Sequence, residues 1–433
     1  MSLRKILFLL VILVCSLQGV SLADPLTLKD CITLALERNP SLQAVKARVL
    51  AAQKYERAAY KNYFPNLELQ YRYTRYRDRQ KIVILGFDVP LSSYEGTEGR
   101  ALINWPLFHG LALRVEHQLK KLDVSLAQVE KRRVRQELIF RVKEAFYELL
   151  KAKKRNKEAQ KSVERLKAHL ELARALYKEG LIARNDLLQS EVALAEGEHA
   201  LVVAQNVVEI SRARLNLLLE RPVAHPTTIV EKLPPLPSLQ SFESYLSFAL
   251  SRRPEIQAAL LALEQARGRV RLAQSTLYPW IDLVGAYEKR GTDLLLTQNP
   301  YWDRENVWVA LNLQWRIFEW GKNLDQISAA RAQVLAQEAK IREIRDQIAF
   351  EVRQAYLKFK EAQNRLKVTQ KSLAQAEENF LLNEARYREQ LASSTDVLDA
   401  EALLTSAKVN FVNALVDLHL ANALLEYTIG SED

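Results

Sequence analysis

Apolar and polar positions along the chain follow two different periods, and the changes of period mark the expected elements. Helical spacing predicts short helices at 28–38 and 242–252, each followed by a longer helix that begins with a proline. Proline suits the first helical turn because the N–H that it lacks would be unpaired there. After Pro65 and Pro279 the period changes to two, which is typical of a strand with one apolar and one polar face.

The alternating segments predict two β-hairpins, at about 66–108 and 280–318, with polar or turn-rich stretches at 77–99 and 291–304 between their strands. The apolar residues of the clearest strand are Val307, Val309, Leu311, Leu313 and Trp315. Strands of about ten residues with aromatic residues near their ends suit a membrane-spanning β-barrel. An ordinary antiparallel sheet with one buried face fits the alternation equally well.

Each predicted β-hairpin is followed by a long helical hairpin, at about 111–220 and at about 322–429. At 1.5 Å per residue the first helix of each pair would be roughly 100 Å long, which no compact domain needs. Apolar positions mix with small residues along these helices, which favours packing along much of their length. The tips are expected near residues 180 and 390.

The same order of elements occurs twice, so the chain contains an internal structural duplication. Four residues recur 210 positions later, namely Trp105, Phe140, Tyr177 and Asp186 as Trp315, Phe350, Tyr387 and Asp396. Such fixed self-similarity indicates one structural unit used twice. The expected domains are repeat 1 at 24–220, a Pro-rich linker at 221–240, repeat 2 at 241–430 and a tail at 431–433.

The N-terminus predicts export from the cytoplasm. Arg4 and Lys5 precede an apolar run at 6–15, and small residues near 21–23 complete the three-part form of a signal peptide, expected at 1–23. No later stretch approaches the roughly twenty apolar residues that a transmembrane helix needs. Export favours the membrane alternative for the strands. Cys31 is then the one remaining cysteine, and we expect it to be a small buried residue.

Composition argues against an enzyme and against a nucleic-acid-binding protein. The 433 residues carry a net charge of +10, but the basic residues are spread along the helices among glutamates, as on solvated helix faces. The six histidines lack metal-ligand spacing, and the sequence has no phosphate-binding glycine-rich loop or nucleophile elbow. We therefore expect no catalysis, no cofactor, no metal site and no nucleic-acid partner.

Four strands per chain leave an open sheet with two unpaired edges. In hydrocarbon each unpaired backbone group costs several kcal/mol, so the edges must pair with other copies of the chain. Closure therefore predicts a homo-oligomer with rotational symmetry. The alternation alone does not choose three copies over two or four.

Short motifs in a fixed and duplicated order carry a family resemblance. They are Asn39-Pro40-Ser41-Leu42, Arg253-Pro254-Glu255-Ile256, Pro65, Pro279, Trp105-Pro106-Leu107-Phe108-His109-Gly110, the tip from Tyr177 through Gly180-Leu181 to Asp186, and the tip from Tyr387 to Asp399. In these motifs the chain resembles the TolC-like outer membrane efflux protein family, and the resemblance covers almost all of the mature chain.

The resemblance implies a homotrimer with mixed membrane α/β architecture. Four strands per chain would contribute to a twelve-stranded β-barrel in outer-membrane lipid, continuous with a long periplasmic α-helical coiled-coil barrel. Such proteins are passive exit ducts of tripartite efflux pumps or of type I secretion, and they dock to a periplasmic adaptor that is coupled to an inner-membrane transporter. The alternative is a periplasmic coiled-coil scaffold or adaptor without a membrane channel.

The resemblance also implies functional residues at the helix tips. Asp396 and Asp399 match acidic residues that ring the periplasmic constriction, and their spacing of three places both on one helix face. Asp186 matches an aspartate that takes part in the closing links, and Tyr387 belongs to the same gate. The implied adaptor-docking residues are Gly180, Leu181 and Leu391.

Structural alternatives exist for several of these residues. The segment 393–396 is also a good helix start, so the sequence alone favours a capping role for Asp396, and Asp399, past the cap, is the better gate candidate. Gly180 also suits a helix C-terminus. The second tip departs from the family pattern, because Ala392 stands where an arginine often forms a closing link, and Arg184 or Arg388 is the expected substitute.

Overall fold

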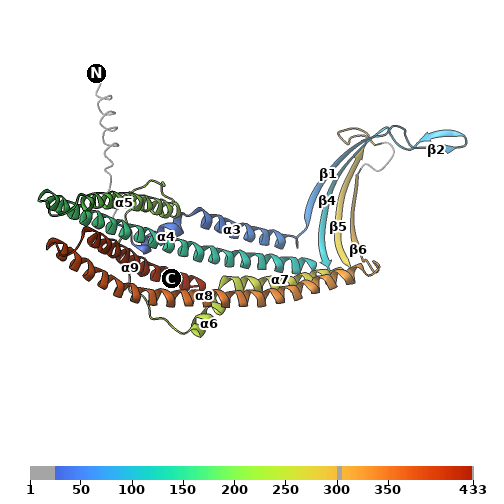
Figure 1. Cartoon of the computed structure of the whole chain (residues 1–433). Helices are drawn as coiled ribbons and strands as arrows, with labels where there is room; N and C mark the ends of the chain where they lie inside the picture. Colours follow the sequence, from blue (N-terminus) through green and yellow to red (C-terminus); the bar gives the residue numbers. More distant parts are fainter. Residues whose placement is uncertain (1–24, 300–304, 432–433) are drawn as a thin grey trace, which may run out of the picture. The chain divides into compact units, whose positions relative to one another are not determined.

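The computed structural model describes residues 25–299 and 305–431, so the predicted signal peptide and the end of the predicted tail lie outside the described residues. The elements (Figure 1) are α2 (Leu28–Arg38), α3 (Pro40–Lys61), β1 (Asn66–Arg75), β2 (Lys81–Ile84), β3 (Phe87–Pro90), β4 (Glu95–His109), α4 (Ala112–Lys178), α5 (Arg184–Leu218), α6 (Phe242–Arg252), α7 (Pro254–Ser275), β5 (Trp280–Gly291), β6 (Glu305–Gln314), α8 (Lys322–Arg388) and α9 (Ser394–Thr428). These bounds confirm the predicted short helices and long helical hairpins.

The helix starts follow from local hydrogen bonds in the sequence. The hydroxyl of Thr27 accepts from the N–H of Asp30 at the start of α2, and that of Ser241 accepts from Ser244 at the start of α6. Each hydroxyl satisfies one of the N–H groups that a helix N-terminus leaves without a partner. The two repeats therefore begin in the same way.

One antiparallel sheet joins the two repeats. Its strand order is β1-β4-β5-β6, and β4 pairs with β5 from Thr97–Gly291 to His109–Trp280, with an irregularity at 106–108. The central pair therefore comes from different copies of the duplicated unit. β1 and β6 are the two edges of this sheet, and each has one side without a partner strand among the described residues.

The connection between β1 and β4 corrects one sequence-based expectation. We expected a polar or turn-rich stretch at 77–99, but the structure has the hairpin of β2 and β3 there, and β4 begins already at Glu95. Leu85 and Gly86 form the hairpin turn with φ values of +52° and +85°. A two-residue turn with two positive φ angles is usually marked by Asn-Gly, and Leu-Gly does not give that signal.

The predicted alternation of the strands is confirmed, and the apolar face is uncovered. Leu69, Val307 and Leu311 expose 78%, 73% and 63% of their surface. On the opposite face Arg100 pairs with Glu288 at 3.3 Å, and Arg290 pairs with Glu98 at 3.2 Å. The described residues therefore do not form an ordinary sheet with a buried apolar face. Such a surface needs hydrocarbon or another protein against it.

A pair of tryptophans repeats the same contact in both copies. The indole N–H of Trp105 donates to the carbonyl oxygen of Tyr63 at 3.1 Å, and that of Trp315 donates to the carbonyl oxygen of Leu277 at 3.1 Å. In each repeat the bond links the end of the second strand to the chain that leads into the first strand. The duplication is thus one of contacts as well as of sequence.

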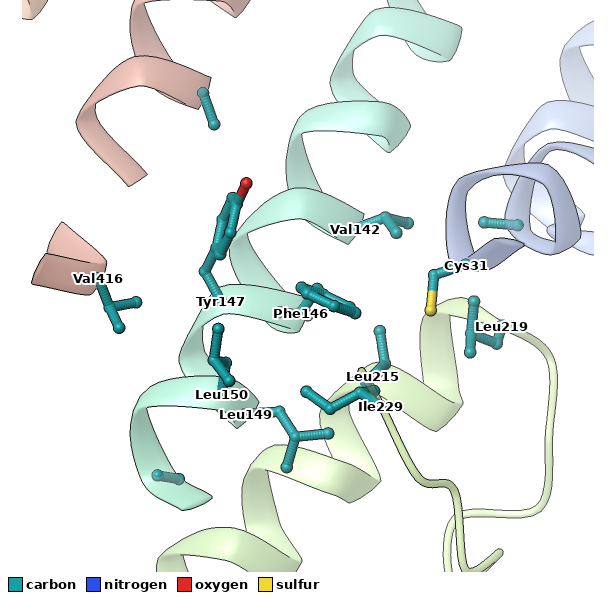
Figure 2. Close-up of a cluster of buried hydrophobic side chains, with 14 of the residues drawn as sticks. Cys31, Val142, Phe146, Tyr147, Leu149, Leu150, Leu215, Leu219, Ile229 and Val416 are labelled. Atoms are coloured by element: carbon teal, nitrogen blue, oxygen red, sulfur yellow. The ribbon is translucent and has the colours of Figure 1, made fainter. Parts of the chain in front are cut away.

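The chain divides into two compact units. One comprises residues to Val45, Lys131–Ile256 and Arg345 onward, and the other comprises Lys46–Glu130 and Gln257–Ile344. The second unit holds the sheet. Within the first unit, a hydrophobic core forms where α2, α4 and α5 meet (Figure 2). Among the described residues, no helix has the length and apolar character that a membrane-crossing helix requires.

The core of the first unit is centred on α4. Leu149 and Leu150 are fully buried, and Figure 2 shows Cys31 among Val142, Phe146 and Leu219. Fully burying each leucine contributes about 1.5–3 kcal/mol relative to exposure. Cys31 is a free, buried cysteine, as the sequence predicts.

The thiol of Cys31 should resist alkylation in the folded protein. Burial raises the pKa of Cys31 to about 12, so the reactive thiolate is scarce near neutral pH. Iodoacetamide treatment and peptide mass spectrometry should find Cys31 unmodified in the native protein and modified after denaturation. A Leu85→Cys variant, exposed at the turn of the β2–β3 hairpin, is the control that should react at once. Equal labelling rates at both positions would contradict burial.

Candidate functional site at the helical hairpin tips

The two helical hairpins end in turns with the same backbone geometry. Gly180 follows α4 with a φ of +72°, and Gln390 follows α8 with a φ of +60°. The N–H of Leu181 and that of Leu391 each donate to a carbonyl oxygen five residues earlier, at 2.9 and 2.8 Å. Both turns are therefore Schellman motifs, which satisfy the last carbonyl groups of a helix. Glycine adopts this conformation freely, whereas glutamine is strained in it.

Apolar side chains are exposed at both tips. Leu181 and Leu391 expose 51% and 69% of their surface. Each occupies the position after the left-handed residue of the turn, where its backbone is fixed by the hydrogen bond described above. The tips thus present one leucine each on a rigid turn, which is a suitable geometry for contact with another protein.

Asp396 caps α9. Its carboxylate accepts from the N–H of Ser393 at 2.8 Å and from the Ser393 hydroxyl at 2.7 Å, while the Ser393 hydroxyl accepts from the N–H of Asp396. The Ser393 hydroxyl, and then its N–H, lower the pKa of Asp396 below the usual range. The capping alternative is therefore observed. The carboxylate stays exposed, so its negative charge still faces solvent.

Asp399 and Asp186 lie on neighbouring helices near the tips. Asp399 is exposed, past the cap, at the edge of a shallow groove between α5 and α9. Asp186 is half-buried in the first turn of α5. Across the same junction the hydroxyl of Thr395 donates to the side-chain carbonyl of Gln189 at 3.0 Å. The structure thus places the starts of α5 and α9 in contact. The carboxylate of Asp399 takes no part in the capping hydrogen bonds of α9.

Tyr387 is buried between the hairpins. It exposes 2% of its surface, and its ring lies 5.0 Å from the ring of His169 on α4. Burial raises the pKa of Tyr387, the hydroxyl of Ser394 opposes this shift, and the charge of Asp186 adds to it. Tyr387 therefore joins α8 to α4 through ring packing.

A second contact ties the hairpins together farther from the tips. The guanidinium of Arg165 on α4 donates to the carboxylate of Glu401 on α9 at 2.8 Å, and the hydroxyls of Ser162 and Thr405 also donate to it at 2.8 Å each. The side chain of Glu401 is only 7% exposed. A buried carboxylate with three donors is well satisfied, and losing one partner would leave a costly buried charge.

Arg388, one of the two expected substitutes for the missing arginine, bonds within its own helix in this structure. Its guanidinium donates to Glu384, one turn earlier on the same helix, at 2.7 Å. Besides Tyr387, the contacts between the hairpins involve residues that the sequence did not single out, above all His169, Ser190 and Ser394. In the other repeat, the positions equivalent to these three residues hold Asn379, Ala400 and Arg184. This difference between the repeats is the one feature of the sequence that could have marked the contact.

Residues 25–299 and 305–431 contain no group of three or more histidine, cysteine, aspartate or glutamate side chains placed to hold a metal ion. The half-buried His169 and the buried His419 have other surroundings. His169 bonds to a hydroxyl, and His419 lies 5.5 Å from the ring of Tyr147 in the helical core. Burial lowers the pKa of His419 and favours its neutral form.

Duplicated strands with an uncovered apolar face, joined to long helical hairpins, define a channel-forming class of outer-membrane protein. Residues 31–220 and 245–431 match the sequence profile described as outer membrane efflux protein. The chain belongs to the outer membrane efflux protein family. This membership confirms the TolC-like resemblance and, with it, an exit duct of the outer membrane that serves efflux or type I secretion. The family consists of channel proteins.

Two curated relatives share part of the sequence. Protein CyaE of Bordetella pertussis is 25% identical over 336 residues, which cover 77% of this chain and 69% of that protein. Outer membrane protein OprJ of Pseudomonas aeruginosa is 26% identical over 191 residues, covering 43% of this chain and 40% of that protein.

Solved structures share the fold over nearly the whole chain. The outer membrane protein VceC of Vibrio cholerae superposes with a TM-score of 0.79 at 20% identity, covering 93% of this chain and 96% of that one. The open state of the MtrE outer membrane channel of Neisseria gonorrhoeae gives 0.76 at 20% identity, covering 94% and 89%. At these identities the likeness establishes the fold.

Exchanging glycine and glutamine at the tips should change stability in opposite directions. Gln390→Gly should stabilise the second tip and Gly180→Gln should destabilise the first, each by about 1 kcal/mol, because only glycine adopts positive φ without strain. A Cβ atom at position 180 would meet no atom within 4 Å, so the cost there is one of backbone conformation. Amide hydrogen exchange of the tip peptides in detergent would measure both changes. Equal exchange in all three proteins would contradict the strain at Gln390.

Proposed function

We propose that three copies of this chain form one passive duct, with a twelve-stranded β-barrel in the outer membrane and a helical barrel across the periplasm. The observation that carries the proposal is the four-stranded sheet with unpaired edges at β1 and β6. A copy of β6 beside β1 of the next chain would pair the edge groups of both. Three chains of four strands each would close a barrel of twelve.

The exposed apolar face supports contact between the sheet and outer-membrane lipid. Leu67, Leu69, Val309 and Leu313 all expose more than half of their surface. The opposite face, with the ion pairs of Arg100 and Arg290, would line a water-filled interior. An apolar outer face with a polar interior is the arrangement found in outer-membrane barrels.

The helix tips are the proposed gate of the duct. Asp396 and Asp399 would be repeated by symmetry as acidic rings, which attract cations at a constriction. The cap fixes Asp396 at the start of α9, and Asp399 follows on the exposed side of the same helix. Asp186 and Tyr387 belong to the same junction between the hairpins.

The exposed residues of the two turns are proposed to contact partner proteins. Gly180, Leu181 and Leu391 form the proposed docking tip for a periplasmic adaptor, which would couple the duct to an inner-membrane transporter. The exposed leucines on rigid turns support this role. Transport energy would come from the transporter, because the duct itself is passive.

Purified protein should form channels in a planar lipid bilayer. We expect discrete conductance steps of uniform size, because a closed barrel has a fixed interior cross-section. Light scattering of the same sample in detergent should give the mass of three chains. Bilayers that stay silent with folded protein at both neutral and acid pH would rule out the duct, and a stable mass of two or four chains would rule out the trimer.

Replacing both gate aspartates should weaken cation selectivity. The double variant Asp396→Ala/Asp399→Ala should shift the reversal potential in a KCl gradient toward zero and reduce block by divalent cations, because the acidic rings lose their charge. Asp346→Ala, an exposed aspartate of α8 far from the tip in sequence, is the matched control. Unchanged selectivity in the double variant would contradict the gate assignment.

A further inference from the structure

Ser394, the first residue of α9, lies at the centre of a buried polar contact between the two helical hairpins. Its hydroxyl oxygen is 2.9 Å from Nε2 of His169 on α4 and 3.1 Å from the hydroxyl oxygen of Ser190 on α5. Ser190 and Ser394 each expose 1% of their surface. The capping role at this helix start belongs to Ser393, so Ser394 is free to bond across the junction.

The number of hydrogens fixes the direction of these bonds. The hydroxyl of Ser190 donates its single hydrogen to the carbonyl oxygen of Asp186 at 2.9 Å. Ser190 must therefore accept from the hydroxyl of Ser394, which uses the single hydrogen of Ser394. The remaining contact requires His169 to donate from Nε2 to the oxygen of Ser394. Every hydroxyl in this arrangement both donates and accepts.

We propose that His169, Ser394 and Ser190 form a one-way hydrogen-bond relay that locks the second hairpin of each subunit against both helices of the first. This inference rests on the proposed gate at the helix tips and names the residues that hold it closed. The relay reaches three helices, α4, α9 and α5, at a place where residues more than 200 positions apart in sequence meet.

The surroundings of His169 determine how the lock responds to protons. The titratable and charged side chains near it come from all four helices of the junction, namely Arg165 of α4, Asp186 of α5, Glu384, Tyr387 and Arg388 of α8 and Glu401 of α9. Arg165 is bonded to Glu401 and Arg388 to Glu384, so the pairs are largely neutralised. Burial dominates and lowers the pKa of His169, while Glu384 opposes the shift.

The sign of the pH response follows from this shift. Nε2 already carries a hydrogen in the relay, so protonation adds a charge at Nδ1 of a half-buried ring. The pKa of His169 is 6.5 when exposed and lower in the closed junction. The closed arrangement is therefore fully favoured above 6.5 and loses this contribution as the pH falls through the lowered pKa. Acid should loosen the lock.

Channel recordings with substituted relay residues test the lock. At about pH 7.5, where His169 is neutral, Ser394→Ala and His169→Phe should raise the open probability by about tenfold, which corresponds to about 1.4 kcal/mol. His169→Gln keeps an N–H donor without a titrating ring. At the same pH its open probability should equal that of the unmodified protein. At about pH 5.5 the unmodified protein should open because His169 is protonated, whereas His169→Gln should not. His199→Gln, on an exposed face of α5, is the control and should change nothing.

A reversible covalent link keeps the test decisive if a substitution disturbs folding. The pair Ser190→Cys/Ser394→Cys, made with Cys31→Ser, replaces two hydroxyls 3.1 Å apart. Copper phenanthroline would oxidise the two thiols to a disulfide and close the channel at both pH values, and dithiothreitol would reopen it. Channels that open equally with the disulfide formed, or Ser394→Ala channels that behave as the unmodified protein, would overturn the lock. Bilayers silent for every variant would instead count against the duct itself.

Discussion

The unpaired edges of the four-stranded sheet are the constraint on which the rest of the structure depends. Pairing of β4 with β5 joins the two repeats into one sheet, but it leaves β1 and β6 open on either side. In hydrocarbon, backbone N–H and C=O groups without partners are too costly to leave exposed. A single chain therefore supplies one sector of a barrel. The long helical hairpins, which follow directly from the strands, must be arranged by the same symmetry.

The duplication supplies equivalent scaffolds that have diverged where function requires it. Trp105 and Trp315 make the same bond to the chain ahead of their β-hairpins, so the scaffold contact is shared. At the helix ends the two copies differ in a reciprocal way. The first copy has glycine at the tip and Glu220 at the base, both with positive φ, whereas the second has Gln390 at the tip and Gly430 at the base. The strained non-glycine residue therefore lies at the base of the first helical hairpin, at Glu220, and at the tip of the second, at Gln390.

Interactions between residues close in sequence made much of this fold predictable. The bounds of α2 and α6 follow from capping hydroxyls and from the prolines after them, and the cap at Asp396 can be anticipated from residues 393–396. The β2–β3 hairpin was missed because its Leu-Gly turn lacks the usual polar residue. The contact of His169 with Ser394 joins residues 225 positions apart, and no local pattern marks it. Periodicity predicts which face of a helix is apolar. It does not predict which polar residues of two different hairpins will contact each other.

Disulfide trapping across the open edges tests the central claim most directly. One cysteine at Val309 of β6 would be combined in turn with single cysteines at Leu67, Leu69, Tyr71 and Tyr73 of β1, in a Cys31→Ser background. In paired antiparallel strands, residues at alternate positions lie on the same face of the sheet. One of the four cysteine pairs should therefore be in register and should link chains by disulfides into covalent dimers and trimers on denaturing gels. The account predicts that the ladder ends at three chains and that either cysteine alone gives a monomer. Monomers for every pair in a folded, membrane-inserted protein would contradict it.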